Sequence, residues 1–217
     1  MLTVVKVGGG LAREAGDDAL RALCGAIAAA GEQHPLLVVP GGGELADAVR
    51  AQDRRLDLRP RTAHWMAILA MDAFGWALAD LIPGAALRPD LPSDARPGVA
   101  VLLPYALLRE RAALPESWAV TSDAIAAWVA GAARAGRLVL VKPVDGLYRE
   151  WPPAGEPIGA LTVDELAALR SGGVDAHLAT ALRAARVETW VVGGRDPLRL
   201  TELLAIGRTT GTRIAAA

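Results

Sequence analysis

The sequence predicts an α/β/α sandwich, a fold of three layers in which helices cover both faces of a mostly parallel central sheet. Short runs rich in Val, Leu and Ile alternate along the chain with longer segments of helical apolar spacing. Such alternation favours parallel strands joined by helices. The 217 residues contain no internal repeat and no low-complexity linker. We therefore expect one domain over residues 1–217.

Each expected strand is a short apolar run bounded by turn residues. The strands are expected at 2–7, 36–39, 99–103, 138–142, 189–192 and 212–215. Each expected helix repeats apolar residues three or four positions apart, and Thr62 is expected to cap the longest one. The helices are expected at 11–30, 44–52, 62–81, 122–135, 162–169, 175–185 and 197–205. Proline-rich stretches at 83–98 and 151–159 are expected to be loops.

One edge of the predicted sheet collects glycines and lysines. Three of the strands run directly into glycines, at 8–10, 41–43 and 193–194. The chain's only two lysines are Lys6, within the first strand, and Lys142, at the end of another. Ligands of open parallel sheets bind at the carboxyl ends of the strands, where glycine lets backbone N–H groups approach a phosphate. This edge is therefore a candidate phosphate-binding site.

Composition and missing motifs exclude several other classes. The formal net charge is −1, which argues against nucleic acid as a partner. No apolar run is long enough to span a membrane and no charged leader precedes the first strand, so we expect a cytoplasmic protein. The chain has no Walker loop, dinucleotide fingerprint or nucleophile elbow. Its three histidines lack metal-ligand spacing, so no metal site made by the protein is expected.

Six segments resemble, in order and over nearly the whole chain, the amino acid kinase family. They are "KVGG" near the start, "VVPGGGELADAVR", "TSDAIAAWVA", "VLVKPVDGLY", "SGGVDAHLATAL" and the closing "GTRI". The short length, "HWMAILAMDAFGWALAD" and "WAVTSDAIAAWVA" look most like the small aspartokinase-related members of that family. Those kinases convert an aminomethylfuran methyl phosphate to its diphosphate in methanofuran or methylofuran synthesis.

The resemblance implies the amino acid kinase fold and the transfer of the γ-phosphoryl group of ATP to a small anionic acceptor, most simply a furan methyl phosphate. Mg²⁺ would be bound mainly through the ATP phosphates, and a homodimer or higher homo-oligomer is expected. Residues up to about 120 would form the acceptor side, and residues from about 121 the nucleotide side.

The same resemblance assigns roles to particular residues. Lys6 and Asp123 would be catalytic. The ATP-binding residues would be Gly8, Gly9, Gly10, Lys142, Asp145, Gly146, Leu147, Tyr148, Gly172 and Gly173. The acceptor-binding residues would be Gly41, Gly42, Gly43, Arg54 and His64, with Arg61 beside them.

One departure from the family pattern leaves alternatives open. Many members carry a phosphate-binding lysine shortly after the Gly-Gly pair, where this chain has the run Val174 to His177. His177, Arg195 or another arginine could supply that charge, and Asp175 could help to hold magnesium. The chain could also be a uridylate-kinase-like or other amino acid or nucleotide kinase, or a non-catalytic protein that binds a nucleotide or oxyanion.

Overall fold

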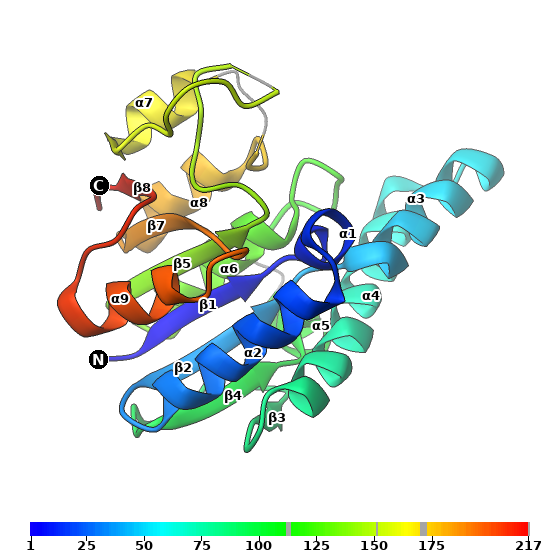
Figure 1. The fold of residues 1–217 in the computed structure, drawn as a ribbon. Coiled ribbons are helices and arrows are strands. Elements are labelled where there is room, and N and C mark those ends of the chain that lie inside the picture. The colour runs from blue at the N-terminus through cyan, green and yellow to red at the C-terminus, as the bar shows by residue number, and fades with distance from the viewer. Residues whose placement is uncertain (112–113, 151, 170–172, 217) are drawn as a thin grey trace.

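The computed structural model describes residues 1–111, 114–150, 152–169 and 173–216 (Figure 1). In this part of the chain, eight strands form one sheet in the order β3-β4-β2-β1-β5-β7-β8-β6. The neighbours pair in parallel, except that β8 runs antiparallel to β7. The strands are β1 Thr3–Val7, β2 Pro35–Pro40, β3 Ala86–Arg88, β4 Gly98–Leu102, β5 Arg137–Lys142, β6 Ala160–Leu161, β7 Glu188–Gly193 and β8 Thr212–Ile214.

Helices cover both faces of this sheet, which confirms the predicted three-layer class. Figure 1 places α2 and α9 over one face and α6 and α8 over the other, while α3 projects beyond the sheet. The helices are α1 Gly10–Ala15, α2 Asp17–Gly31, α3 Gly43–Leu56, α4 Pro60–Leu81, α5 Pro104–Arg111, α6 Ser122–Ala132, α7 Val163–Ala168, α8 Leu178–Ala185 and α9 Leu198–Ile206. None of these described helices is both long and apolar enough to cross a membrane.

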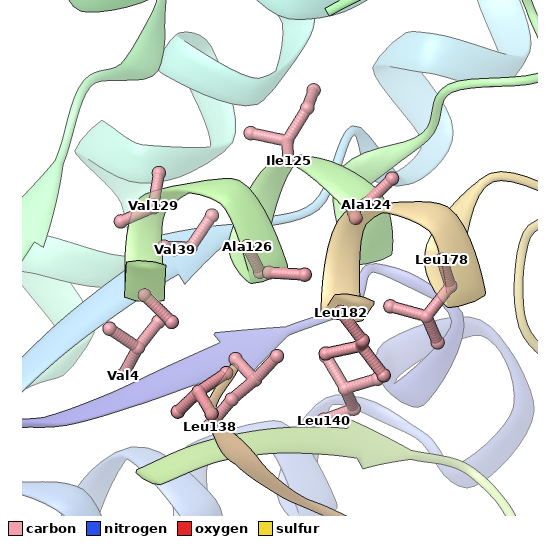
Figure 2. Close-up of a cluster of buried hydrophobic side chains, with 14 of the residues drawn as sticks. Val4, Val39, Ala124, Ile125, Ala126, Val129, Leu138, Leu140, Leu178 and Leu182 are labelled. Atoms are coloured by element: carbon pink, nitrogen blue, oxygen red, sulfur yellow. The ribbon is translucent and has the colours of Figure 1, made fainter. Parts of the chain in front are cut away.

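Strand alternation divides the core into two layers of side chains. Val5 and Val7 of β1 pack into the layer beneath α2 and α9. Val4 of β1, together with Leu138 and Leu140 of β5, packs into the layer beneath α6 and α8 (Figure 2). Because successive side chains of a strand point to opposite faces, Lys6 and Lys142 belong to this second layer.

The structure corrects several element boundaries. The helix expected at 11–30 is two helices, because Gly16 adopts a positive φ of 88° between α1 and α2. The prediction that Thr62 caps the long helix was wrong, since α4 begins at Pro60, a residue suited to the first helical turn. The short strands β3 and β6 were not predicted, because each is too brief to show a period. Helix α5 was not predicted, because its apolar residues form no clear helical stripe.

Candidate active site

Two adjacent parallel strands bring the chain's two lysines together. Lys6 of β1 is paired with Leu140 of β5, so Lys142 lies two residues further along β5 on the same face. Both side chains point toward the face that carries α6. Lys6 is 5% exposed, and the Lys142 side chain is 12% exposed. Two ammonium groups so poorly solvated need a nearby negative charge.

Asp123, the second residue of α6, supplies that charge. Its Oδ2 accepts a hydrogen bond from Lys142 Nζ at 2.5 Å, and its Oδ1 lies 3.0 Å from Lys6 Nζ. The residue is 3% exposed. Burial opposes ionisation of the carboxyl, but the ammonium groups of Lys142 and Lys6 outweigh it, so the pKa of Asp123 lies well below its usual range. The cluster of two lysines and one carboxylate retains an excess positive charge.

Burial acts in the opposite direction on Lys142. Loss of hydration lowers the pKa of its ammonium group, and repulsion from Lys6 adds to that effect against the attraction of Asp123. A desolvated ammonium group interacts more strongly with an arriving anion than a hydrated one does. The cluster is therefore suited to a negatively charged ligand.

The first two glycine runs lie against each other beside this cluster. A Cβ on Gly9 would overlap the Cα of Gly43, and a Cβ on Gly41 would lie 3.0 Å from the Cα of Gly8. A Cβ on Gly8 would also lie 2.8 Å from Lys6 Nζ. Glycine at these positions lets two loops meet and leaves room for the Lys6 ammonium group. The α3 helix begins at Gly43, so its N-terminus adds positive potential here.

A cavity of about 260 Å³ opens over the cluster and the glycine loops. Its charged lining consists of four cations, Lys6, Arg13, Arg50 and Lys142, against two carboxylates, Asp47 and Asp123. This balance favours a ligand with several negative charges. Lys6 and Lys142 lie at the buried end of the cavity, whereas Arg13 and Arg50 are about half exposed. Both arginines are ion-paired with Asp47, with nitrogen–oxygen distances of 2.9 Å for Arg13 and 2.8 Å for Arg50.

Asp175 holds the helix that carries Asp123. Its Oδ2 accepts hydrogen bonds from Thr121 N at 3.1 Å, Thr121 Oγ1 at 2.8 Å and Ala124 N at 2.9 Å. Asp175 thus caps the N-terminus of α6 from a distant segment, a role that Thr121 does not fill with its own side chain. Burial raises the pKa of Asp175 despite these donors. These contacts account for Asp175 without a metal ion.

The loop before α6 contacts the cavity through Trp118, which lines it, and through Ser117, which contacts the lining residue His64. Trp118 donates from Nε1 to Asp53 Oδ2 at 2.7 Å, and the Arg50 guanidinium lies 4.9 Å from the centre of its ring. Ser117 O lies 3.3 Å from Nδ1 of His64. Burial lowers the pKa of His64, so this side chain is neutral near pH 7 and offers hydrogen bonding rather than charge.

The cavity lining includes many of the residues assigned from sequence. The structure brings together Lys6, Gly8, Gly9, Gly10, Gly41, Gly42, Gly43, His64, Asp123 and Lys142. Arg54 lies outside this lining, on an exposed part of α3, and Arg50 one turn earlier lines the cavity in its place. Arg61 is ion-paired with Glu116 at 3.1 Å and does not line the cavity.

The remaining assigned nucleotide residues lie away from this cavity. Asp145, Gly146, Leu147 and Tyr148 are in the loop after β5, where Leu147 and Tyr148 are buried. The backbone N–H of Leu147 donates to Thr212 Oγ1 at 2.8 Å, which fixes the loop against β8. Gly173 adopts a φ of 118° just before Asp175, and Gly172 lies outside the described residues. Their roles in binding ATP stay predictions.

Sequence reasoning missed three residues that line the cavity, Arg13, Arg50 and Trp118. It considered Asp175 only as a possible magnesium ligand and missed that it caps α6. Arg13 could have been found, because it occupies the first turns after a glycine run. Trp118 and the capping role of Asp175 could not, because they depend on tertiary contacts. Within the described residues, no cluster of three or more His, Cys, Asp or Glu side chains has the arrangement of a metal site.

Comparisons with known proteins agree with this architecture. The model of the amino acid kinase family matches residues 1–90 and 94–192. A [5-(aminomethyl)furan-3-yl]methyl phosphate kinase from Methanocaldococcus jannaschii is 29% identical over 204 residues, covering 93% of this chain and 92% of the relative. A uridylate kinase from Thermococcus kodakarensis is 27% identical over 207 residues, covering 90% of each chain.

Solved structures share the fold at lower identity. The uridylate kinase of Archaeoglobus fulgidus superposes with a TM-score of 0.75 at 22% identity, covering 99% of this chain and 100% of its own. The UMP kinase of Ureaplasma parvum superposes with a TM-score of 0.73 at 15% identity, covering 99% of each chain.

Fold and site together define an α/β protein with a cationic cavity between two glycine loops and a lysine–aspartate–lysine cluster. With the family match across most of its length, the chain belongs to the amino acid kinase family. It is therefore a phosphotransferase.

Proposed function

We propose that this protein transfers the γ-phosphoryl group of MgATP to the phosphate of a small acceptor, most simply an aminomethylfuran methyl phosphate. The observation that carries this proposal is the meeting of Lys6 and Lys142 on Asp123 at the buried end of a cavity lined by two glycine runs. The relative that phosphorylates such a furan covers nearly the whole chain and supports the choice of acceptor.

The reaction would form a bond between the γ-phosphorus and an acceptor oxygen while the bond to the β–γ bridging oxygen breaks, leaving ADP. A phosphate acceptor is already anionic, so no general base is needed; the difficulty is to hold two repelling anions in line. Lys6 would neutralise charge on the moving group, while the N–H groups of Gly8, Gly9 and Gly10 would position it. Asp123 would orient the ammonium of Lys6.

Mg²⁺ would enter with the nucleotide, bound mainly through its phosphates, and would spread the charge of the transferred group. Its fit rests on the charge of the cavity, whose cations suit the phosphates that would carry the ion. Of the acceptor-side residues, Gly41, Gly42 and Gly43 line the cavity closest to the first glycine run. We propose that they face the acceptor.

A direct assay tests the proposal. The purified protein is given MgATP with aminomethylfuran methyl phosphate, UMP, aspartate or acetylglutamate, and ADP release is followed with phosphorus NMR of the product. We expect acceptor-dependent ADP formation and a diphosphate product with the furan. Lys6→Ala and Lys6→Arg should each lower kcat by about 10² or more, since an electrostatic contact made in the transition state is lost. ADP release that depends on none of these acceptors contradicts the proposal.

Uridylate kinase activity is the second candidate, because a uridylate kinase relative also matches over 90% of the chain. Turnover with UMP but not with the furan would favour it. A non-catalytic role in nucleotide or oxyanion binding would instead give nucleotide binding by calorimetry without turnover of any acceptor. The joint presence of Lys6, Lys142 and Asp123 speaks against that role.

We also propose a cytoplasmic homodimer. Leu69 and Trp76 lie two helical turns apart on α4 and are 47% and 62% exposed. An apolar stripe on a long helix can pack against the same stripe of a second copy around a two-fold axis.

A further inference from the structure

The family resemblance implies a phosphate-binding lysine shortly after the Gly-Gly pair, and this chain has no lysine there. Its place in this chain is occupied by the residues that lead to Asp175, whose carboxylate is already used by four backbone and hydroxyl donors. The site therefore needs another source for a second positive charge on the phosphates. The described cations can be tested one by one by what they already contact.

The candidates outside β5 are occupied or remote. Arg13 and Arg50 line the cavity, but both are ion-paired with Asp47 and about half exposed. Arg195 donates to the carbonyls of Pro143 and Glu14, both at 2.9 Å, and so ties the loop after β5 to α1. Arg199 lies 3.5 Å from Asp196 and 4.0 Å from Asp145. Neither Arg195 nor Arg199 lines the cavity, and His177 does not line it either.

Lys142 does line the cavity, at its buried end, and shares Asp123 with Lys6. We infer that Lys142 is a second catalytic residue, which contacts the phosphoryl group during its transfer and takes the place of the lysine missing from the later segment. The last residue of β5 thus supplies the second positive charge. This inference rests on the proposed function and assigns Lys142 to the transferred group rather than to nucleotide binding alone.

The geometry gives a physical reason for this role. An ammonium group has three N–H donors, and Asp123 engages Lys142 from one side only. The donors that remain can meet an anion, and the excess positive charge of the cluster is neutralised when a phosphoryl group arrives. Because this environment is desolvated, the gain is larger than at an exposed lysine.

Steady-state kinetics of Lys142→Met and Arg195→Met separate the two sources of charge. We expect Lys142→Met to lower kcat by about 10² or more, with a smaller change in the KM for ATP. We expect Arg195→Met to keep a kcat close to wild type. A Lys142→Met enzyme with unchanged kcat and raised KM would reduce Lys142 to a nucleotide contact and overturn the inference. Loss of kcat in Arg195→Met alone would also overturn it.

Chemical rescue excludes a merely structural effect. Lys142→Cys is treated with 2-bromoethylamine, which restores an ammonium group on a side chain of nearly the same length. The only native cysteine, Cys24, is fully buried, and burial raises the pKa of its thiol to about 11, so it stays unreactive in the folded protein. We expect alkylation to recover most of the lost kcat. A folded, alkylated and inactive enzyme contradicts the assignment.

Equilibrium binding decides the matter even if no acceptor is turned over. A cation that meets the γ-phosphoryl group adds more to the affinity for ATP than to that for ADP. Calorimetry should therefore show that Lys142→Met weakens ATP binding by about tenfold more than ADP binding, the ratio that 1.4 kcal/mol produces. Equal losses for ATP and ADP overturn the role of Lys142, whereas absent turnover with the expected binding difference overturns only the proposed acceptor chemistry.

Discussion

Asp123 carries one negative charge but serves two ammonium groups, and all three side chains are withdrawn from water. A structural ion pair would balance one charge with one. The extra lysine costs desolvation energy that folding alone does not recover, and the cost is offset when an anion binds. The excess of two ammonium groups over one carboxylate therefore distinguishes a ligand-binding site from an ion pair that only stabilises the fold.

Asp123→Asn should destabilise the protein by about 3 kcal/mol, because both buried lysines would lose the carboxylate they contact, leaving Lys142 only the weaker attraction of Asp175. Urea unfolding followed by circular dichroism measures the change. Lys142→Met is the matched control: it leaves Lys6 and Asp123 as a balanced pair, so its free energy of unfolding should be no lower than that of the wild type. If both variants lose the same stability, the cluster is a structural ion network.

At the scale of elements, the site depends on how closely the loops after β1 and β2 approach. Gly9 touches the start of α3 so closely that a side chain would overlap its backbone. Gly9→Ala should therefore separate the two loops, cost about 2 kcal/mol of stability and weaken ATP binding. Thermal unfolding and calorimetry measure the two effects.

Gly25→Ala provides the control for that change. Gly25 lies within α2, and nothing is within 4 Å of the position its Cβ would take. The same substitution should there raise stability by about 0.5 to 1 kcal/mol, because alanine loses less backbone entropy in a helix. A Gly9→Ala protein as stable as the wild type and equally good at binding ATP would contradict the close-approach argument.

Another element-scale prediction concerns the stripe on α4. The wild type should elute as a dimer in size-exclusion chromatography with light scattering, and Trp76→Glu should shift it toward the monomer, because a buried carboxylate would have no partner. Leu198→Glu is the control, since Leu198 on α9 is 70% exposed but belongs to another face. A monomeric wild type, or dissociation by Leu198→Glu alone, would rule out α4 as the interface.

Across the whole molecule, the order of strands and helices could be predicted from periodicity, and so could the sheet edge where the glycine runs and the two lysines lie. The sequence also shows that the two lysines point to the same face of their strands as Val4 and Leu140, because each lies two residues from one of them. The pairing register that makes Lys6 and Lys142 neighbours could not be predicted, because it depends on contacts between segments more than a hundred residues apart. The break at Gly16 could not be predicted, because a single glycine is tolerated within a helix and the sequence does not reveal its positive φ.

The site residues divide in the same way. Lys6, Asp123 and the glycines could be assigned from short segments that resemble family motifs, whereas the hydrogen bond between Trp118 and Asp53 joins residues far apart in sequence. Arg54 was assigned and Arg50 was not considered, because the sequence does not show which side of α3 faces the cavity. Long-range packing, rather than local propensity, decides such choices.

Alkaline pH should affect activity and stability in opposite directions. The pKa of Lys142 is lower in the folded protein than in the unfolded chain, so between these two values the unfolded state binds more protons. The contribution of Lys142 to the free energy of unfolding therefore rises with pH across that window. Over the same range kcat should fall, because the neutral amine no longer stabilises the transferred charge.

Urea unfolding and kcat are measured from pH 7 to 10.5, with Lys142→Met as reference. The difference in stability between wild type and variant should move in favour of the wild type as its kcat declines. A constant difference alongside a constant kcat would mean that Lys142 keeps an ordinary pKa.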